Sequence, residues 1–368
     1  MLINGKISAS QLAIFIYMFA LGSAVLILPS TIVSIAKQDA WITLIMTLIV
    51  QLGFAWLYLK LADRFPDETI TEYGTRLLGA VLGKCLCIVY LVYFLILSAL
   101  VLRNVGDFIY TNLLIQTPTL ATQIFIMVAV AYGTFLGIEV LGRAGEVLFV
   151  IVVFTVLLAC LFLLPHVKMS NILPILPEGL LQPLKGVYPV LGFPISELSV
   201  VLFLFPYVRN REKLKRYFYF SMALAPLSGL VVAFFTITVM GVEDTIRSPY
   251  AVYEMAKKIQ VGEFFERIEA LVGILWISTI FIKLSLCFYA VVKITSQLFN
   301  LSSHRTLILP YVFVVVPFST IIYDHLSQSR EIIFQWPLIS LFQGLFLPLL
   351  LLLIAMIIRK SNKQEPDC

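Results

Sequence analysis

The feature of this chain that most constrains its fold is a series of long stretches without charged residues. Eight stretches contain no Asp, Glu, Lys, Arg or His and reach the ~18 residues that a helix needs to cross a bilayer. Two further stretches of the same span each carry a single charge. We therefore expect ten transmembrane helices, within residues 9–36, 40–59, 85–102, 108–138, 147–165, 186–208, 217–242, 270–292, 306–323 and 332–358.

The composition excludes most other classes of protein. The chain of 368 residues is 60% hydrophobic and 13% charged, whereas soluble domains are about 45–50% apolar and about 25% charged. A net charge of +5 implies no nucleic-acid partner, and the 5 cysteines and 3 histidines lack the paired spacing of a metal site. The sequence predicts an all-α membrane protein surrounded by the lipid bilayer, with no metal and no cofactor.

An even number of crossings places both termini on one side of the membrane. Lys and Arg residues are denser in the loops of that side, above all in RNREKLKR at 209–216, so we expect both termini to be cytoplasmic. The longest polar connection, 241–269, lies on the other side. Its apolar residues recur at near-helical spacing, which favours a lid helix over the outer mouth, and a solvated hairpin is the alternative.

Helix-breaking residues gather in the first helix of each five-helix half. Proline removes an amide donor and glycine relaxes the backbone, so both helices are expected to unwind near the middle of the membrane. A simple proline kink is the alternative. Paired breaks predict one domain, 1–368, built from inverted repeats at about 8–165 and 184–358. The breakers are Gly22, Ser23 and Pro29 in the first helix, and Gly186, Pro189, Gly192 and Pro194 in the sixth.

Two charged residues, Glu197 and Lys283, lie within the expected spans. Each costs at least ~2.5 kcal/mol at a helix centre unless it is paired or faces water. Their depths match, so we expect an intramembrane charge pair. The pair is either structural, or Lys283 supplies a fixed positive charge while Glu197 orients the backbone or exchanges a proton. No catalytic residues are expected, since the histidines occupy different loops and no enzyme motif is present.

Three strings resemble a known family: GFPISELSVVLFLFP, ISASQLAIFIYMFALGSAVLILP and GEFFERIEALVGILWISTIFIKLSL. They are similar to the integral-membrane B subunit of spore-germination nutrient receptors, a branch of the amino acid–polyamine–organocation transporter superfamily. The resemblance implies a LeuT-like fold of five plus five helices with helices 1 and 6 discontinuous. It also implies the bacterial spore inner membrane, an amino-acid germinant, and two partners, a receptor A subunit and a lipoprotein C subunit.

The resemblance also implies where the germinant binds. The backbones at the two breaks would hold its charged ends, and residues of the third and eighth helices would meet its side chain. A proton-coupled amino-acid permease is the alternative function, because alternating access needs the same broken helices. The residues expected to bind the ligand are Gly22, Ser23 and Ala24, then Gly192, Phe193, Pro194, Ile195 and Ser196, and finally Tyr93, Ser98, Trp276 and Thr279.

Overall fold

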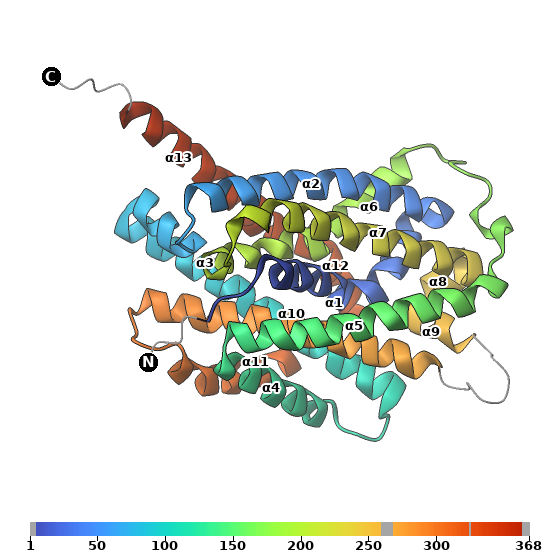
Figure 1. Ribbon diagram of the computed structural model, residues 1–368. Helices are drawn as coiled ribbons and strands as arrows, with labels where there is room; N and C mark the ends of the chain where they lie inside the picture. The colour runs from blue at the N-terminus through green and yellow to red at the C-terminus, as the bar shows by residue number, and fades with distance from the viewer. Residues whose placement is uncertain (1–4, 259–267, 324, 363–368) are drawn as a thin grey trace.

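A computed structural model describes residues 5–258, 268–323 and 325–362. Within these residues the chain is a bundle of helices (Figure 1), and its only β-type pairing is an isolated bridge between Ile7 and Val208. Eight segments are long and apolar enough to cross a membrane. Together with 9–22, which is the first part of α1, and the shorter helix 305–321, they cover the ten crossings expected from the sequence.

The first five crossings are α1 (Ala9–Ala36), α2 (Ala40–Arg64), α3 (Ile70–Phe108), α4 (Thr119–Leu136) and α5 (Ile138–Leu163). The sixth is interrupted and consists of α6 (Leu181–Val190), a π-turn η5 (Leu191–Ile195) and a 3-10 helix η6 (Ser196–Phe203). The remaining four are α7 (Leu214–Met240), α10 (Ile268–Leu298), α11 (Ile308–Ile321), and α12 (Leu326–Leu341) continued through the π-turn η10 (Phe342–Phe346) into α13 (Leu347–Asn362). The chain enters and leaves the bundle at the same end (Figure 1).

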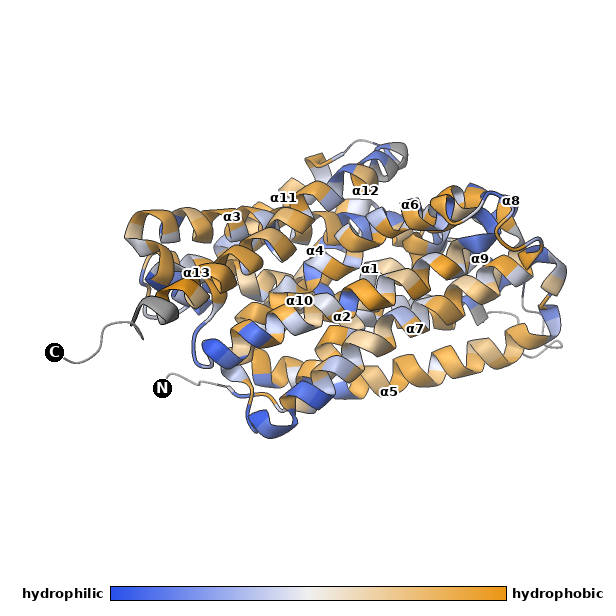
Figure 2. Ribbon diagram, turned by 90° about the horizontal axis from the view of Figure 1, so that it is seen from above, coloured by the Kyte–Doolittle hydropathy of each residue, from blue (hydrophilic) through white to orange (hydrophobic). Residues whose placement is uncertain are grey.

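Burial divides the crossings into central and peripheral helices. In the most apolar part of segment 181–203, 89% of residues are buried inside the protein, against 17% for segment 138–166. The peripheral helix α5 is orange along most of its length in Figure 2, and Val147, Val150, Phe154 and Leu157 are exposed at helical spacing. Such a stripe is suited to lipid contact. The broken helix 6 is therefore central.

Local sequence signals set several helix ends and bends. Ser8 caps α1, because its hydroxyl accepts the amide of Gln11 at 3.0 Å while the Gln11 side chain accepts the Ser8 amide at 2.9 Å. Helix α3 starts well before the apolar stretch 85–102 and bends at Gly79, whose φ of 83° suits glycine. The part of α3 after Gly79 therefore runs at an angle to the turns before it.

The prediction that helix 1 is broken was wrong. Helix α1 is continuous from Ala9 to Ala36, through Gly22 and with Pro29 inside it. One proline removes a single amide donor, and packing of α1 against α6, α7 and α10 supports the turns on either side. Gly22 has a different role: a Cβ there would lie 2.9 Å from Cδ of Lys283, so the glycine admits the lysine side chain.

The connection after α7 is partly helical, as expected. It forms α8 (Val242–Arg247) and α9 (Ala251–Lys257), and the rest of the predicted lid, 259–267, lies outside the described residues. The rings of Tyr250 and Tyr253 each meet the ring of Phe108 edge to face at 5.1 Å. Segment α9 thus packs on the C-terminal end of α3.

Candidate functional site

The sixth crossing loses regular helical form where its prolines and glycines cluster. Phe193 has an extended backbone (φ −142°, ψ 107°) between α6 and η6. A Cβ on Gly192 would lie 2.4 Å from Cα of Pro337 in α12. The glycine therefore permits close approach of helix α12, and the expected break in helix 6 is confirmed.

Directly after the break, Glu197 forms a buried ion pair with Lys283 of α10. The Lys283 ammonium donates to Glu197 Oε2 at 2.6 Å, and the exposed fractions of the two side chains are 0% and 1%. The structure thus brings the two charges together. In a medium of low dielectric constant the pair is far less costly than either charge alone.

Aromatic side chains complete the surroundings of this pair. Trp336 of α12 donates its indole N–H to Glu197 Oε1 at 2.7 Å. The Lys283 ammonium lies 4.9 Å from the ring centroid of Phe19 and 4.8 Å from that of Phe193. Both charges therefore have partners besides each other, through cation–π contacts and a charge-assisted hydrogen bond.

A cavity of about 370 Å³ runs from this pair toward the end of the bundle where α8 and α9 lie. Among the described residues that line it, Glu197 is the only charged one. Most of the remaining wall is apolar, as is usual for small-molecule sites. The walls come from α1 (Ile27, Ser30, Thr31, Ser34), α3 (Leu97, Leu100, Val101, Asn104), the connection 246–250, Tyr323, and α12 (Ile332, Ile333, Phe334, Trp336), with Phe193 and Glu197 from helix 6.

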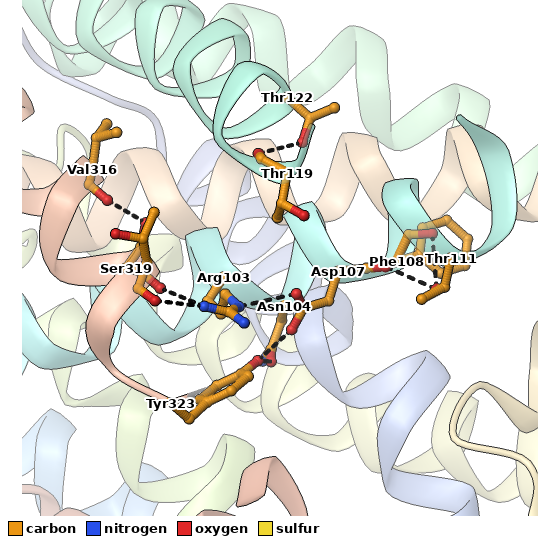
Figure 3. Close-up of polar contacts among 11 residues, drawn as sticks. Arg103, Asn104, Asp107, Phe108, Thr111, Thr119, Thr122, Val316, Ser319 and Tyr323 are labelled. Atoms are coloured by element: carbon orange, nitrogen blue, oxygen red, sulfur yellow. Dashed lines mark hydrogen bonds and ion pairs between the residues drawn. The ribbon is translucent and has the colours of Figure 1, made fainter. Parts of the chain in front are cut away.

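A polar cluster, drawn in Figure 3, includes Asn104 and Tyr323 of the cavity wall. Arg103 donates to Asp107 Oδ1 at 2.9 Å and to the carbonyl of Thr320 at 2.7 Å, and its guanidinium lies 4.5 Å from the Tyr323 ring centroid. The Tyr323 hydroxyl donates to Asp107 Oδ2 at 2.8 Å and contacts Asn104 Oδ1 at 3.3 Å. The cluster joins α3 to the end of α11 beside the cavity wall.

Residues 6–329, which are most of the chain, match the protein family described as Spore germination protein. The chain belongs to this family. It is 30% identical to Spore germination protein KB of Bacillus subtilis (strain 168) over 373 residues, 98% of each protein. Spore germination protein YndE of the same organism is 27% identical over 306 residues, 81% of this chain and 82% of the relative.

A solved structure shares the fold. The crystal structure of MhsT in complex with L-phenylalanine superimposes with a TM-score of 0.71 over 96% of this chain and 99% of that one, at 11% sequence identity. This likeness shows the fold alone. This spore germination protein is therefore a multi-pass membrane protein of LeuT-like fold.

Of the expected ligand-binding residues whose side chains the structure describes, Phe193 alone lines the cavity; Glu197, expected as half of the charge pair, lines it too. Ala24 and Pro194 line a separate apolar pocket of about 40 Å³. Gly22 contacts Lys283, and Gly192 contacts Pro337. For Ser23 the helical backbone is described but the side chain is not.

The expected residues of the third and eighth helices lie behind the cavity wall. The Tyr93 hydroxyl shares a hydrogen bond with Ser340 at 3.0 Å, and its ring stacks on Trp336 at 5.2 Å. Trp276 packs against Phe108 at 4.7 Å. These side chains support the site from outside. Ser98 and Thr279 donate to carbonyls of their own helices, at Phe94 and Trp276.

The last expected residues, Ile195 and Ser196, are buried, and Ser196 contacts η10 of the tenth crossing. Gln343 of η10 donates to the Ser196 carbonyl at 3.1 Å and accepts the Ser199 hydroxyl at 2.7 Å. Ile195 is fully buried. The unwound carbonyl that was expected to face a ligand is therefore satisfied by the protein itself.

Sequence reasoning missed Trp336, Gln343 and the cluster around Arg103. Arg103 lies between the expected spans 85–102 and 108–138, although Arg103 and Asp107 have the four-residue spacing of an ion pair on one helix face. Nothing in the sequence pairs Trp336 or Gln343 with helix 6. Among the described residues, no group of three or more metal-ligating side chains is close enough to hold a metal ion.

We expect Asp107→Asn to destabilise this spore germination protein by about 1–3 kcal/mol, because Arg103 would lose the carboxylate that neutralises it in a mostly buried place. Thermal unfolding of the purified protein measures the effect. Glu243→Gln is the matched control: Glu243 pairs with Arg247 at the same spacing, but both side chains are largely exposed. That change should cost less than about 0.5 kcal/mol. Equal effects of the two substitutions would contradict a supporting role for the cluster.

Proposed function

We propose that this chain is the germinant-sensing membrane subunit of a spore nutrient receptor. It binds a small germinant, an amino acid, at mid-membrane in the cavity between helices 1 and 6. Binding changes the packing around helix 6, and partner subunits receive the change and trigger germination. The chain acts as a receptor and not as an enzyme.

The observation that carries this proposal is the position of Glu197, which lines the cavity and is paired with Lys283 behind the wall. A cavity of about 370 Å³ is suited to a ligand the size of an amino acid. Apolar walls with one charged group fit a ligand with a polar head and an apolar body. The family membership and the fold shared with a protein solved in complex with L-phenylalanine support the same reading.

The proposed setting follows the resemblance of the whole chain. We place the protein in the spore inner membrane with both termini on the cytoplasmic, core side, and we propose a receptor A subunit and a lipoprotein C subunit as its partners. One domain made of repeats at about 8–165 and 184–358 provides the site between its halves, and segment 241–269 acts as the outer lid. The basic connection 209–216 supports this orientation.

A second candidate function is a proton-coupled amino-acid permease. The LeuT-like fold and the buried carboxylate of Glu197 favour it. Uptake of labelled amino acids into proteoliposomes under a proton gradient separates the two functions. The receptor role predicts binding without accumulation, whereas gradient-driven accumulation by this chain alone would establish the permease.

The proposal is tested by a thermal-shift screen of the purified protein against the standard amino acids, combined with a variant that fills the cavity. Val101 lines the cavity and is 1% exposed. We expect Val101→Trp to abolish the shift given by the best amino acid. Val92 lies on the same helix with 47% of its side chain exposed, so Val92→Trp should leave the shift unchanged. A screen without any shift, or a full shift in Val101→Trp, would refute binding in this cavity.

A further inference from the structure

The continuity of helix 1 removes one source of hydrogen bonds for a bound carboxylate. In transporters with discontinuous helices, the free amides at a half-helix N-terminus face anionic groups of the substrate. Here α1 runs unbroken from Ala9 to Ala36, so its amides near Gly22 are used within the helix. A carboxylate bound at this depth needs a different positive group.

Lys283 lies at the place where those amides would act. Its Cδ would be 2.9 Å from a Cβ on Gly22, so the lysine passes directly beside the middle of α1. Its ammonium carries three donors, and the acceptor that the structure provides is Glu197 Oε2. Phe193 both lines the cavity and contacts the ammonium, so its ring separates the cavity from Lys283.

Glu197 is the matching group for a ligand ammonium. Its oxygens accept from Lys283 and Trp336, and a carboxylate has sites for about four hydrogen bonds. Other polar groups of the wall present acceptors, because Ser30 and Thr31 donate their hydroxyl hydrogens to the carbonyl of Ile27. The inner part of the cavity therefore favours a ligand that donates hydrogen bonds.

We propose that the Glu197–Lys283 pair recognises a zwitterion by exchange of partners. The ligand ammonium takes the place of Lys283 on Glu197, the ligand carboxylate takes the place of Glu197 on Lys283, and Phe193 turns aside to admit it. The site stays neutral throughout, whereas a cation or an anion alone would leave an uncompensated charge in an apolar surrounding. This inference rests on the proposed function and names its ligand class as zwitterionic amino acids.

The first test compares three probes on the wild-type protein in lipid nanodiscs by calorimetry. They are the amino acid with the largest thermal shift, its decarboxylated amine and its deaminated acid; for L-leucine these are isoamylamine and isocaproate. We expect both analogues to bind at least ~100-fold more weakly, since each leaves one buried charge unpaired. An analogue that binds as tightly as the amino acid would overturn the exchange while leaving the proposed function intact. If no amino acid binds, both fail.

The second test uses single substitutions that should change which of the three probes the protein binds most tightly. Lys283→Met leaves the carboxylate of Glu197, so the amine should bind more tightly than the amino acid. Glu197→Gln leaves the ammonium of Lys283, so the acid should bind more tightly. If the single variants do not fold, the double variant Glu197→Gln/Lys283→Met is used, because it has no unpaired charge. It should bind the amino acid at least ~100-fold more weakly than the wild type does. Retained affinity in the double variant would overturn the proposal.

A matched control removes a different ion pair. Arg143 and Glu139 pair at 2.8 Å on the surface, with side chains 72% and 33% exposed. The double variant Glu139→Gln/Arg143→Met should rank the three probes as the wild type does. A structure with the amino acid bound gives the direct view: the distance from Lys283 Nζ to Glu197 Oε2 should increase from 2.6 Å to beyond hydrogen-bond range. An unchanged pair beside a bound amino acid would contradict the exchange.

Discussion

Replacing Lys283 by methionine is expected to destabilise the protein by about 3–5 kcal/mol, because it leaves the carboxylate of Glu197 buried without its cation. Trp336 would then be the one remaining donor that the structure gives to Glu197. Glu197→Gln should cost a similar amount, since the Lys283 ammonium would lose the negative charge of its partner and keep a neutral amide oxygen and the rings of Phe19 and Phe193. The double variant should be clearly milder than either single variant, because no unpaired charge remains.

The measurement is a double-mutant cycle of thermal or denaturant unfolding in the same detergent. The two substitutions should be strongly non-additive, with a coupling free energy of about 1–3 kcal/mol or more. The surface pair of Arg143 and Glu139 provides the control cycle, whose coupling should stay below about 0.5 kcal/mol. Additive losses at Glu197 and Lys283 would mean that the pair contributes nothing to stability beyond its separate side chains.

The second large effect is expected at the glycines where the sixth crossing packs against the tenth crossing, which consists of α12, η10 and α13. A Cβ on Gly344 would lie 2.4 Å from the carbonyl oxygen of Ser196, and a Cβ on Gly192 would lie 2.4 Å from Cα of Pro337. Both neighbours are backbone atoms, which cannot turn aside as a side chain can. We therefore expect Gly344→Ala and Gly192→Ala each to cost about 1–3 kcal/mol or more through overpacking. Separation of η10 from η6 would also weaken the hydrogen bonds of Gln343.

Protein level and thermal unfolding of these variants measure the effect. Gly53 is the matched control in helix α2, because nothing lies within 4 Å of the position of its Cβ. Gly53→Ala should be neutral or stabilising by about 0.5–1 kcal/mol. Gly22→Ala should rank between them, since its Cβ would meet the flexible side chain of Lys283. If Gly344→Ala were as stable as the wild type, the close packing of η10 on η6 would be contradicted.

Local sequence patterns are sufficient to predict the crossings and the break in helix 6. A span is defined by its length and by the absence of charge, which are properties of a contiguous segment. Pro194 and Gly192 disrupt the sixth helix through their own backbones, wherever the neighbouring helices lie. The pairing of Glu197 with Lys283 could also be predicted, because two isolated charges at equal depth in a bilayer have few alternatives to each other.

The sequence by itself therefore determined the membrane class, the number of helices, the broken sixth helix and the buried charge pair. Only the tertiary structure decided that α1 is continuous, that Trp336 and Gln343 hold helix 6, and that the cavity extends from Glu197 to Tyr250. These features depend on which helix faces reach one another across the bundle. The residues that meet there are more than a hundred positions apart in the chain, and packing of side chains, which no local pattern encodes, brings them together.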